Sequence, residues 1–472
     1  MSLRGFPGTM VQHRKGGAQP AGSRYRPAAA PNANVILGHC LAYACAMVGA
    51  VLVFSATDLG GLFGIAVALM AAKFSRSIMV FFLSLANVSL FLAFDNFIRV
   101  NPVFYFYGRG PNTGSSGDGS SAAYICLATT LIFCAIGMID AARKARPNHE
   151  FLVSFEFPPV SRLLFWPTVA TILTTSVFII AREDFVFAST YNAYELQKYP
   201  MLEYFSLLIA FAIQSAKNID RRSVIISYTA GAIFTLVCLA TSYRMVAIVC
   251  TLSIFAMYWH NRRVSKLTII CVWAISYVFL TYISYWRVNH YDVTVGNIFG
   301  YFNGRMDNTF TGVIETALIY TEIGRHQEWG QKISHMIGAL APIPSSFMPP
   351  SMNYLVSAQE RYGFPGGGAL AGFLVYFNYI YALPFLLYVW FAYRYAGKIG
   401  IASGMYFILF ITVMRWWLYG PYALFKFLGI FLALMFINFL ALWLDDKAIS
   451  RSARRWRGRV AAPLPDQRLQ SE

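Results

Sequence analysis

Residues 422–444 read YALFKFLGIFLALMFINFLALWL, an apolar run in which Lys426 is the single charged side chain. A helix needs about 20 consecutive apolar residues to cross the hydrocarbon layer of a bilayer. The run is long enough for that crossing and contains no proline that would break a helix. It therefore predicts a transmembrane helix close to the C-terminus.

Eleven further apolar segments precede this run, at about 35–55, 60–74, 78–97, 122–141, 164–181, 201–216, 224–242, 245–259, 267–285, 369–392 and 399–417. The whole chain is 57% hydrophobic and 12% charged, whereas soluble domains carry roughly 25% charged residues. We therefore expect an all-α, polytopic integral membrane protein with about 12 transmembrane helices. Segment 60–74 is short and rich in glycine, so it either crosses with a tilt or re-enters the same side.

The hydrophilic segments divide the 472 residues into five regions. We expect a disordered basic tail at 1–33, helices one to nine at 34–285, a large outer loop at 286–368, helices ten to twelve at 369–444 and a second basic tail at 445–472. No apolar stretch follows Met1 closely, so the first tail is not expected to be a cleavable signal peptide.

The basic residues indicate the orientation of the helices. Lys and Arg collect on the cytoplasmic side of membrane proteins, and an N-terminus inside places 26 of the 38 Lys and Arg residues on that side. We expect a bacterial inner membrane protein with both termini cytoplasmic. The net charge of +17 then reflects topology and contact with membrane lipids, so we expect no nucleic-acid partner.

Metal and nucleotide chemistry has little support in the sequence. The seven cysteines lie in apolar segments without a metal-ligand spacing, so they are interpreted as small buried hydrophobic residues. The chain contains no HExxH, P-loop, GxSxG or DxD sequence. We expect neither a metal site nor a cofactor, and a donor activated by a nucleotide is disfavoured.

Of the 12 basic residues that this topology leaves on the outer side, four lie at helix ends close to the bilayer: Arg244, Arg287, Arg415 and Lys426. A cation at a helix end near the bilayer is costly without a partner. If these residues meet, they form an anion site, and arginine suits phosphate because its planar fork binds two oxygens at once. The alternative for each is a side chain that reaches to the interface or a buried ion pair.

The large outer loop supplies candidates for proton transfer. Residues 306–340 show an apolar helical period that predicts an amphipathic helix lying on the membrane. His326 is the first candidate general base and Glu360 the first carboxylate candidate. Other candidates in the same loop are His290, His335, Glu322 and Glu328.

Three segments carry a resemblance: ATSYRMVAIV (240–249), APIPSSFMPP (341–350) and GFPGGGALAGFLVYFNYIYALP (363–384). Together with the helix number and one large outer loop before the last three helices, they resemble the Wzy-type O-antigen and exopolysaccharide repeat-unit polymerases, which are related to the O-antigen ligases. The acidic residue often found within the last of these motifs is absent here, with Gly372 and Tyr376 in its neighbourhood.

The resemblance implies a GT-C-like glycosyltransferase at the periplasmic face. It would transfer a glycan from undecaprenyl pyrophosphate to the next lipid-linked oligosaccharide repeat without a metal, and a separate co-polymerase would set chain length. In this reading the four basic residues bind the pyrophosphate, and His326 or Glu360 deprotonates the acceptor hydroxyl. The remaining candidates stack on sugar rings: Trp416, Trp417 and Tyr419.

Three other functions stay open. An O-antigen ligase uses the same donor and leaving group, so the residues barely separate it from a polymerase. A transporter of lipid-linked sugars or polysaccharide is disfavoured because no internal repeat is visible and the unusual charges gather at one face. A membrane acyltransferase would be expected to carry a clear histidine motif on the inner side.

Overall fold

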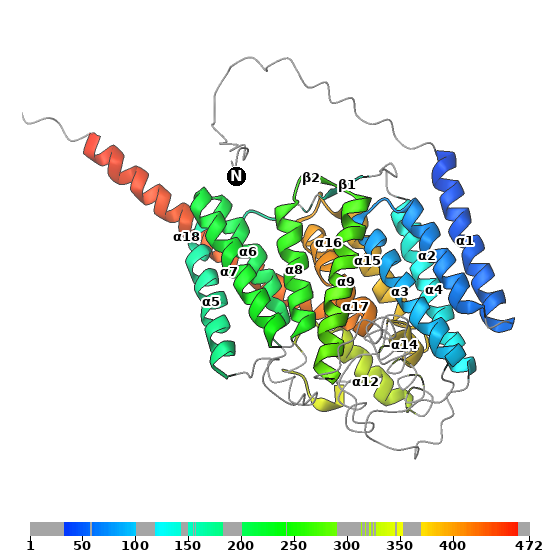
Figure 1. Cartoon of the computed structure of the whole chain (residues 1–472). Coiled ribbons are helices and arrows are strands. Elements are labelled where there is room, and N and C mark those ends of the chain that lie inside the picture. Colours follow the sequence, from blue (N-terminus) through cyan, green and yellow to red (C-terminus); the bar gives the residue numbers. More distant parts are fainter. Residues whose placement is uncertain are drawn as a thin grey trace, which may run out of the picture.

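The structure is a computed structural model that describes residues 33–56, 59–100, 119–142, 150–153, 155, 157–182, 201–241, 243–289, 313, 317, 321, 324, 327–344, 347–352 and 370–460. The described part is almost entirely helical. The helices are packed side by side with their axes running between two ends of a bundle (Figure 1). The expectation of an all-α chain is therefore confirmed.

The helices follow the predicted apolar segments closely. The first nine segments correspond to α1 (Ala33–Ala56), α2 (Gly60–Phe74), α3 (Ile78–Val100), α4 (Gly119–Ala141), α5 (Phe165–Arg182), α6 (Phe205–Lys217), α7 (Arg221–Ala240), α8 (Arg244–Tyr258) and α9 (Lys266–Asn289). Short 3-10 turns precede α5 and α6, namely η1 (Arg162–Leu164) and η3 (Leu202–Tyr204). Hydrophobic periodicity and length were sufficient to place these helices.

Two of the remaining three segments are not single helices. Segment 369–392 contains α14 (Leu370–Tyr376) and α15 (Ala382–Tyr395), and segment 399–417 contains α16 (Gly400–Ile411) and α17 (Val413–Tyr419). The last segment belongs to α18 (Tyr422–Val460). Among the described helices, five are long and apolar enough to cross a membrane, or six when the bent pair α16–α17 is one span. The twelve-span topology remains a prediction.

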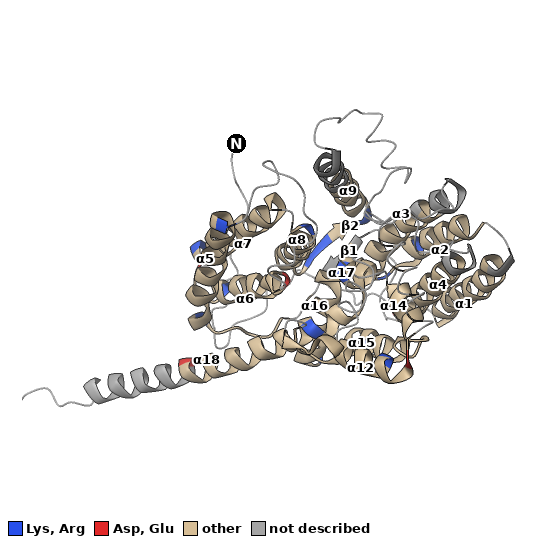
Figure 2. Cartoon of the chain, turned by 90° about the horizontal axis from the view of Figure 1, so that it is seen from below, with Lys and Arg blue, Asp and Glu red and all other residues tan. Residues whose placement is uncertain are grey.

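The two ends of the bundle differ in chemistry. One end carries a short antiparallel strand pair, β1 (Glu150–Val153) with β2 (Arg262–Ser265), and the other carries α12 (Trp329–Leu340) and α14 (Figure 1). Basic residues lie at the strand end, in β2 and at the junction of α6 with α7 (Figure 2). We call these the basic end and the loop end.

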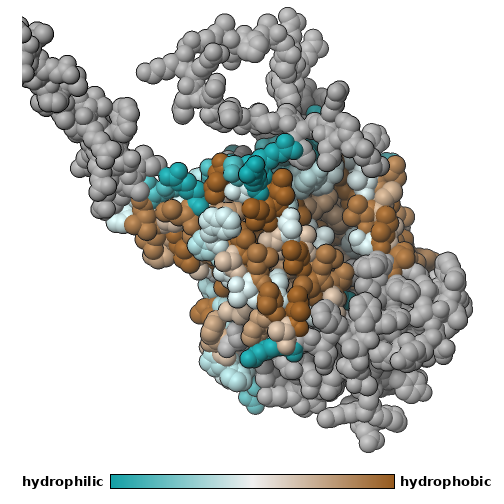
Figure 3. Space-filling view, turned by 60° about the vertical axis from the view of Figure 1, so that its left-hand side comes forward, coloured by the Kyte–Doolittle hydropathy of each residue, from teal (hydrophilic) through white to brown (hydrophobic). Residues whose placement is uncertain are grey.

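The outer surface of the helices is apolar, as a bilayer requires. In α1, Leu37, Leu41 and Leu52 are exposed, and in α5 Trp166 and Val177 are exposed. Figure 3 shows hydrophobic residues along the helices and hydrophilic residues at the basic end. An exposed apolar surface of this extent is typical of a face covered by lipid or by another apolar partner.

The large loop packs into the protein at the positions that the structure describes. Val313, Ala317 and Thr321 are helical and buried. A Cβ atom on Gly372 of α14 would lie 2.7 Å from the Cα atom of Ala317, so these backbones are in close contact. At these positions the predicted apolar face packs against α14, whereas α12, in the same predicted range, leaves Trp329, Ile333 and Ile337 exposed, so a location on the membrane surface stays a prediction.

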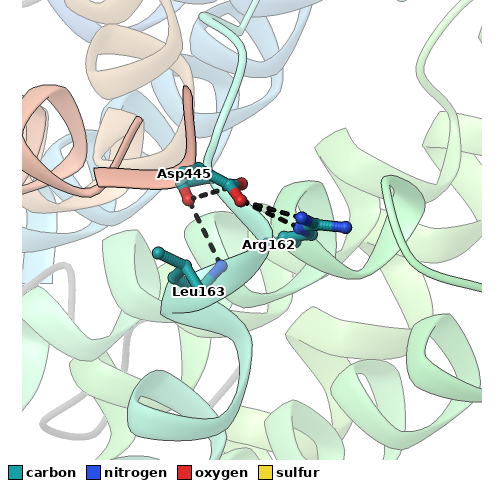
Figure 4. Close-up of polar contacts among 4 residues, drawn as sticks. Arg162, Leu163 and Asp445 are labelled. Atoms are coloured by element: carbon teal, nitrogen blue, oxygen red, sulfur yellow. Dashed lines mark hydrogen bonds and ion pairs between the residues drawn. The ribbon is translucent and has the colours of Figure 1, made fainter. Parts of the chain in front are cut away.

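A polar clamp fixes α18 to the segment before α5 near the basic end. The side-chain amide of Asn438 donates to the carbonyl oxygen of Pro159 and accepts from the backbone N–H of Ser161, each at 2.9 Å. About two turns further along, Asp445 forms an ion pair with Arg162 at 3.0 Å (Figure 4). The buried amide thus satisfies two backbone groups that would otherwise lack partners.

We expect Asn438→Leu to destabilise the protein. The substitution leaves the buried backbone N–H of Ser161 without its acceptor, which costs about 1–3 kcal/mol. Thermal unfolding of the purified protein in detergent measures the loss. Phe439→Leu is the matched control, because that ring is 63% exposed. Equal melting temperatures for both variants would contradict the clamp.

Candidate functional site

Two interrupted helices lie next to each other in the half of the bundle near the loop end. Between α14 and α15, Asn378 and Tyr379 have φ angles of 50° and 63°, in the left-handed region that non-glycine residues rarely adopt. The second interruption, at Thr412, bends α17 by 66° from α16. Helix α14 packs against α17. In membrane proteins, interrupted helices are tolerated where protein buries them or where they line a cavity, and many substrate sites use them.

Arg415 of α17 is the central charged residue of this region. Its Nε atom lies 2.9 Å from Oε1 and 3.0 Å from Oε2 of Glu203, which belongs to η3. The guanidinium also lies over the rings of Tyr419 and Tyr422, at 5.0 and 5.5 Å from their centroids. Both charged side chains keep some exposure, at 17% and 20%. The arrangement is an ion pair bordered by aromatic rings.

The sequence predicted Arg415 but missed its counter-charge. Glu203 is 212 residues away along the chain, so no local pattern connects the two residues. One signal was available: Glu203 lies near the start of the apolar segment 201–216, at the end that the predicted topology puts on the same side as Arg415. Of the two alternatives that the sequence left for Arg415, an anion site or an ion pair, the structure shows an ion pair with Glu203, and a role in substrate binding stays a prediction.

Lys426 has a different environment from the one predicted. It is 3% exposed, and its ammonium donates to the carbonyl oxygens of Gly338 at 2.6 Å and Ala341 at 2.8 Å, with Met348 Sδ at 3.0 Å. These carbonyls belong to the C-terminal turn of α12, the negative end of that helix. All three protons of the ammonium thus have acceptors in the protein. Lys426 anchors α12 to α18, and in this structure it does not face an open anion site.

For the other two predicted cations, Arg244 and Arg287, the structure describes the helices to which they belong. Arg244 is the first residue of α8, and α8 packs against both η3 and α17, which carry Glu203 and Arg415. Arg287 lies in the last turn of α9, but its side chain is outside the described residues. His326, Glu360 and His290 are also outside them. The structure therefore brings the helix that begins with Arg244 beside the ion pair and leaves the predicted bases untested.

The predicted sugar-stacking residues divide into two groups. Trp416 and Trp417 are 0% and 1% exposed, and they pack against Phe385 and Phe133. Their prediction as sugar platforms is wrong in this structure, because protein side chains occupy the faces that a sugar would need. Tyr419 is half-buried and contacts the Arg415 guanidinium. It stays a candidate.

Helix α12 contacts the interruption between α14 and α15 through two residues one turn apart. The Nδ1 atom of His335 lies 2.6 Å from the hydroxyl oxygen of Tyr376, and the Lys332 ammonium lies 3.4 Å from Oδ1 of Asn378. His335 is 0% exposed, and this burial lowers the pKa of its imidazole below the ordinary 6.5. His335 is thus a neutral, interior residue that joins α12 to the strained segment.

We expect His335 to make stability depend on pH. The pKa of His335 is lower in the folded protein than in the unfolded chain, so the unfolded chain takes up the proton first and the folded state loses stability as the pH falls below about 7. The melting temperature of the wild type relative to His335→Gln should therefore decrease between pH 7.5 and 5.5. A constant difference across this range would contradict the prediction.

Several buried polar groups near the centre of the bundle lack a hydrogen-bond partner within the described residues. They are the amide of Asn87, the hydroxyls of Tyr381 and Tyr388, and the indole Nε1 of Trp417. Tyr381 and Tyr388 are seven residues apart and share one face of α15. Unsatisfied buried groups are rare in native proteins and call for a partner such as water or a ligand.

Over the ranges that the structure describes, no group of three or more His, Cys, Asp or Glu side chains could hold a metal ion. The chemistry visible at the loop end is therefore that of Arg415, Glu203, the surrounding tyrosines and the helix that begins with Arg244. No protein family, characterised protein or solved structure matches this chain.

Proposed function

We propose that the protein is a membrane glycosyltransferase that polymerises polysaccharide at the outer face of a bacterial inner membrane. It transfers a glycan from undecaprenyl pyrophosphate to the next lipid-linked oligosaccharide repeat. In this proposal the loop end is the periplasmic end and the basic end is cytoplasmic, because basic residues favour the cytoplasmic side. Both termini are then cytoplasmic, and the proposed partner is a co-polymerase that sets chain length.

The observation that carries the proposal is the ion pair between Arg415 and Glu203. It lies against two tyrosine rings, and Arg415 belongs to α17, an interrupted helix in the half of the bundle away from β1 and β2 (Figure 1). A diphosphate carries more negative charge than a carboxylate and offers the same pair of oxygens to a guanidinium. It can therefore compete with Glu203 for Arg415. The apolar outer surface of the helices suits the polyprenyl chain of such a donor.

When the diphosphate displaces Glu203 from Arg415, each of these two residues becomes available for one part of the reaction. The acceptor hydroxyl oxygen forms a bond to the anomeric carbon of the donor glycan, and the bond from that carbon to the diphosphate oxygen breaks with its electron pair. Arg415 stabilises the departing diphosphate, with Arg244 as its proposed neighbour. Glu203, released from Arg415, is a carboxylate that can take the hydroxyl proton. His326 and Glu360 remain the alternatives for this last role.

The decisive experiment uses the purified full chain in proteoliposomes with an undecaprenyl-pyrophosphate-linked oligosaccharide as the only substrate. A ladder of longer lipid-linked products, with release of undecaprenyl pyrophosphate, supports the polymerase. Products that appear only when a lipid A core acceptor is added indicate a ligase instead. Movement of the substrate across the bilayer without a new glycosidic bond indicates a transporter and overturns the proposal.

A further inference from the structure

Helix α18 is much longer than a membrane crossing requires. It runs from Tyr422 to Val460 over 39 residues, and only Tyr422–Asp445 is apolar enough to span a bilayer. That part alone is about 36 Å long at 1.5 Å per residue, which exceeds the ~30 Å of hydrocarbon. The rest, residues 446–460, continues as helix beyond the bundle (Figure 1). We call it the helical extension.

The helical extension divides by sequence into a basic face and an apolar face. At 100° per residue, one face collects Lys447, Arg451, Arg454, Arg455 and Arg459. The opposite face collects Ile449, Ala453, Trp456 and Val460, and the charged residues Asp446 and Arg457 lie at its edge, next to Ala453. A separation of this kind, with tryptophan on the apolar side and arginine on the polar side, is typical of helices that lie in a membrane interface.

The position of the helical extension agrees with this pattern. It begins directly after Asp445, whose ion pair with Arg162 holds α18 against the segment before α5. Arg162 and the junction of α6 with α7 belong to the basic end, so the extension leaves the bundle on the side where positive charge collects. The extension therefore begins at the basic end, directly after the apolar part of α18 that is long enough to span a bilayer.

We propose that the helical extension is an anchor that binds anionic phospholipid headgroups of the leaflet at the basic end. Its apolar face enters the boundary between headgroups and acyl chains, and its arginines contact lipid phosphates. Anionic lipid attracts basic residues next to a membrane span, and each Lys or Arg near the surface adds to the attraction. A nucleic-acid partner would leave the apolar face without a role. This inference does not depend on glycosyl transfer.

Hydrogen–deuterium exchange of the full chain in nanodiscs tests the inference. We expect amides of residues 446–460 to exchange at least about tenfold more slowly in discs with 30% phosphatidylglycerol than in discs of phosphatidylcholine alone. The protection should disappear in the variant R451Q/R454Q/R455Q/R459Q. It should also weaken at high salt, because salt screens exposed charges.

The matched control is R4Q/R14Q/R24Q/R26Q, which removes the same charge from the N-terminal tail. It should leave the protection of residues 446–460 unchanged. Equal exchange in the two lipid compositions would overturn the inference, and so would protection that survives in R451Q/R454Q/R455Q/R459Q, since the helix would then be held by the protein itself. Loss of protection in both quadruple variants would indicate a general effect of net charge and would also overturn it.

Discussion

Arg415→Ala will lower the rate of chain extension by about 10²–10³-fold, the loss found when one group that stabilises transition-state charge is removed. The same substitution leaves Glu203 without its counter-charge. The pair is partly exposed, so the expected loss of stability is about 2 kcal/mol, between the values for surface and buried pairs. A second variant is therefore needed to separate the effect of Arg415→Ala on the extension rate from its effect on the stability of the protein.

The double variant Arg415→Met with Glu203→Gln makes this separation. It removes both charges together, so neither is left unpaired, and the melting temperature should return close to that of the wild type. The extension rate should stay as low as in Arg415→Ala, because no guanidinium remains for the diphosphate. Arg415→Lys should recover only part of the rate, since an ammonium cannot bind two oxygens in the same fork geometry.

The measurement is the initial rate of product formation in proteoliposomes, together with the melting temperature of each variant. Arg182→Ala is the matched control, because Arg182 is an exposed arginine at the end of α5 that lies over the Phe178 ring. It should change neither quantity. Normal extension by the stable double variant would exclude Arg415 from the reaction.

The sequence predicted the helices well because their apolar runs are long and separated by charged turns. It did not predict the interruptions in α14–α15 and α16–α17. Residues 369–392 and 399–417 are mostly apolar, and polar residues such as Asn378 and Thr412 did not mark the breaks by themselves. The side chain of Asn378, which has a left-handed φ angle, contacts Lys332 of α12. Tertiary contacts of this kind have no signature in hydrophobic periodicity.

The candidate site was predicted in part for a similar reason. A misplaced positive charge is visible in a sequence, so Arg415 and Lys426 were found. Their partners are not visible, because one is a carboxylate 212 residues away and the others are backbone carbonyls. Aromatic content likewise indicated Trp416 and Trp417 without showing that both are buried. The sequence was therefore sufficient to predict which charged residues are unusual, whereas their contacts depend on the packing of distant segments.

The contact between α12 and α18 gives the second large prediction. A Cβ atom on Gly429 would lie 1.7 Å from the carbonyl oxygen of Pro342, and the neighbour is backbone that cannot turn aside. Gly429→Ala should therefore push the segment after α12 away from α18, at a cost of about 1–3 kcal/mol. Lys426 lies one turn earlier on the same helix, so its bonds to Gly338 and Ala341 should weaken together with this contact.

Hydrogen–deuterium exchange of residues 329–340 measures this loss directly. We expect exchange to accelerate by roughly 10- to 100-fold in Gly429→Ala, which corresponds to the stated range at about 1.4 kcal/mol for each factor of ten. Lys426→Met should act in the same direction, because it leaves the carbonyls at the end of α12 without a donor. Gly400→Ala is the matched control, since a Cβ atom at Gly400 meets nothing within 4 Å.

These variants also decide between two roles for Lys426. If the residue only anchors α12, Gly429→Ala and Lys426→Met should reduce chain extension to a similar degree, because both release the same helix. If Lys426 also binds the diphosphate, Lys426→Met should lower the rate well below that of Gly429→Ala at equal exchange of α12. The structure, in which all three ammonium protons already have acceptors, predicts the first result. A large additional loss in Lys426→Met would show that the ammonium leaves α12 when substrate binds.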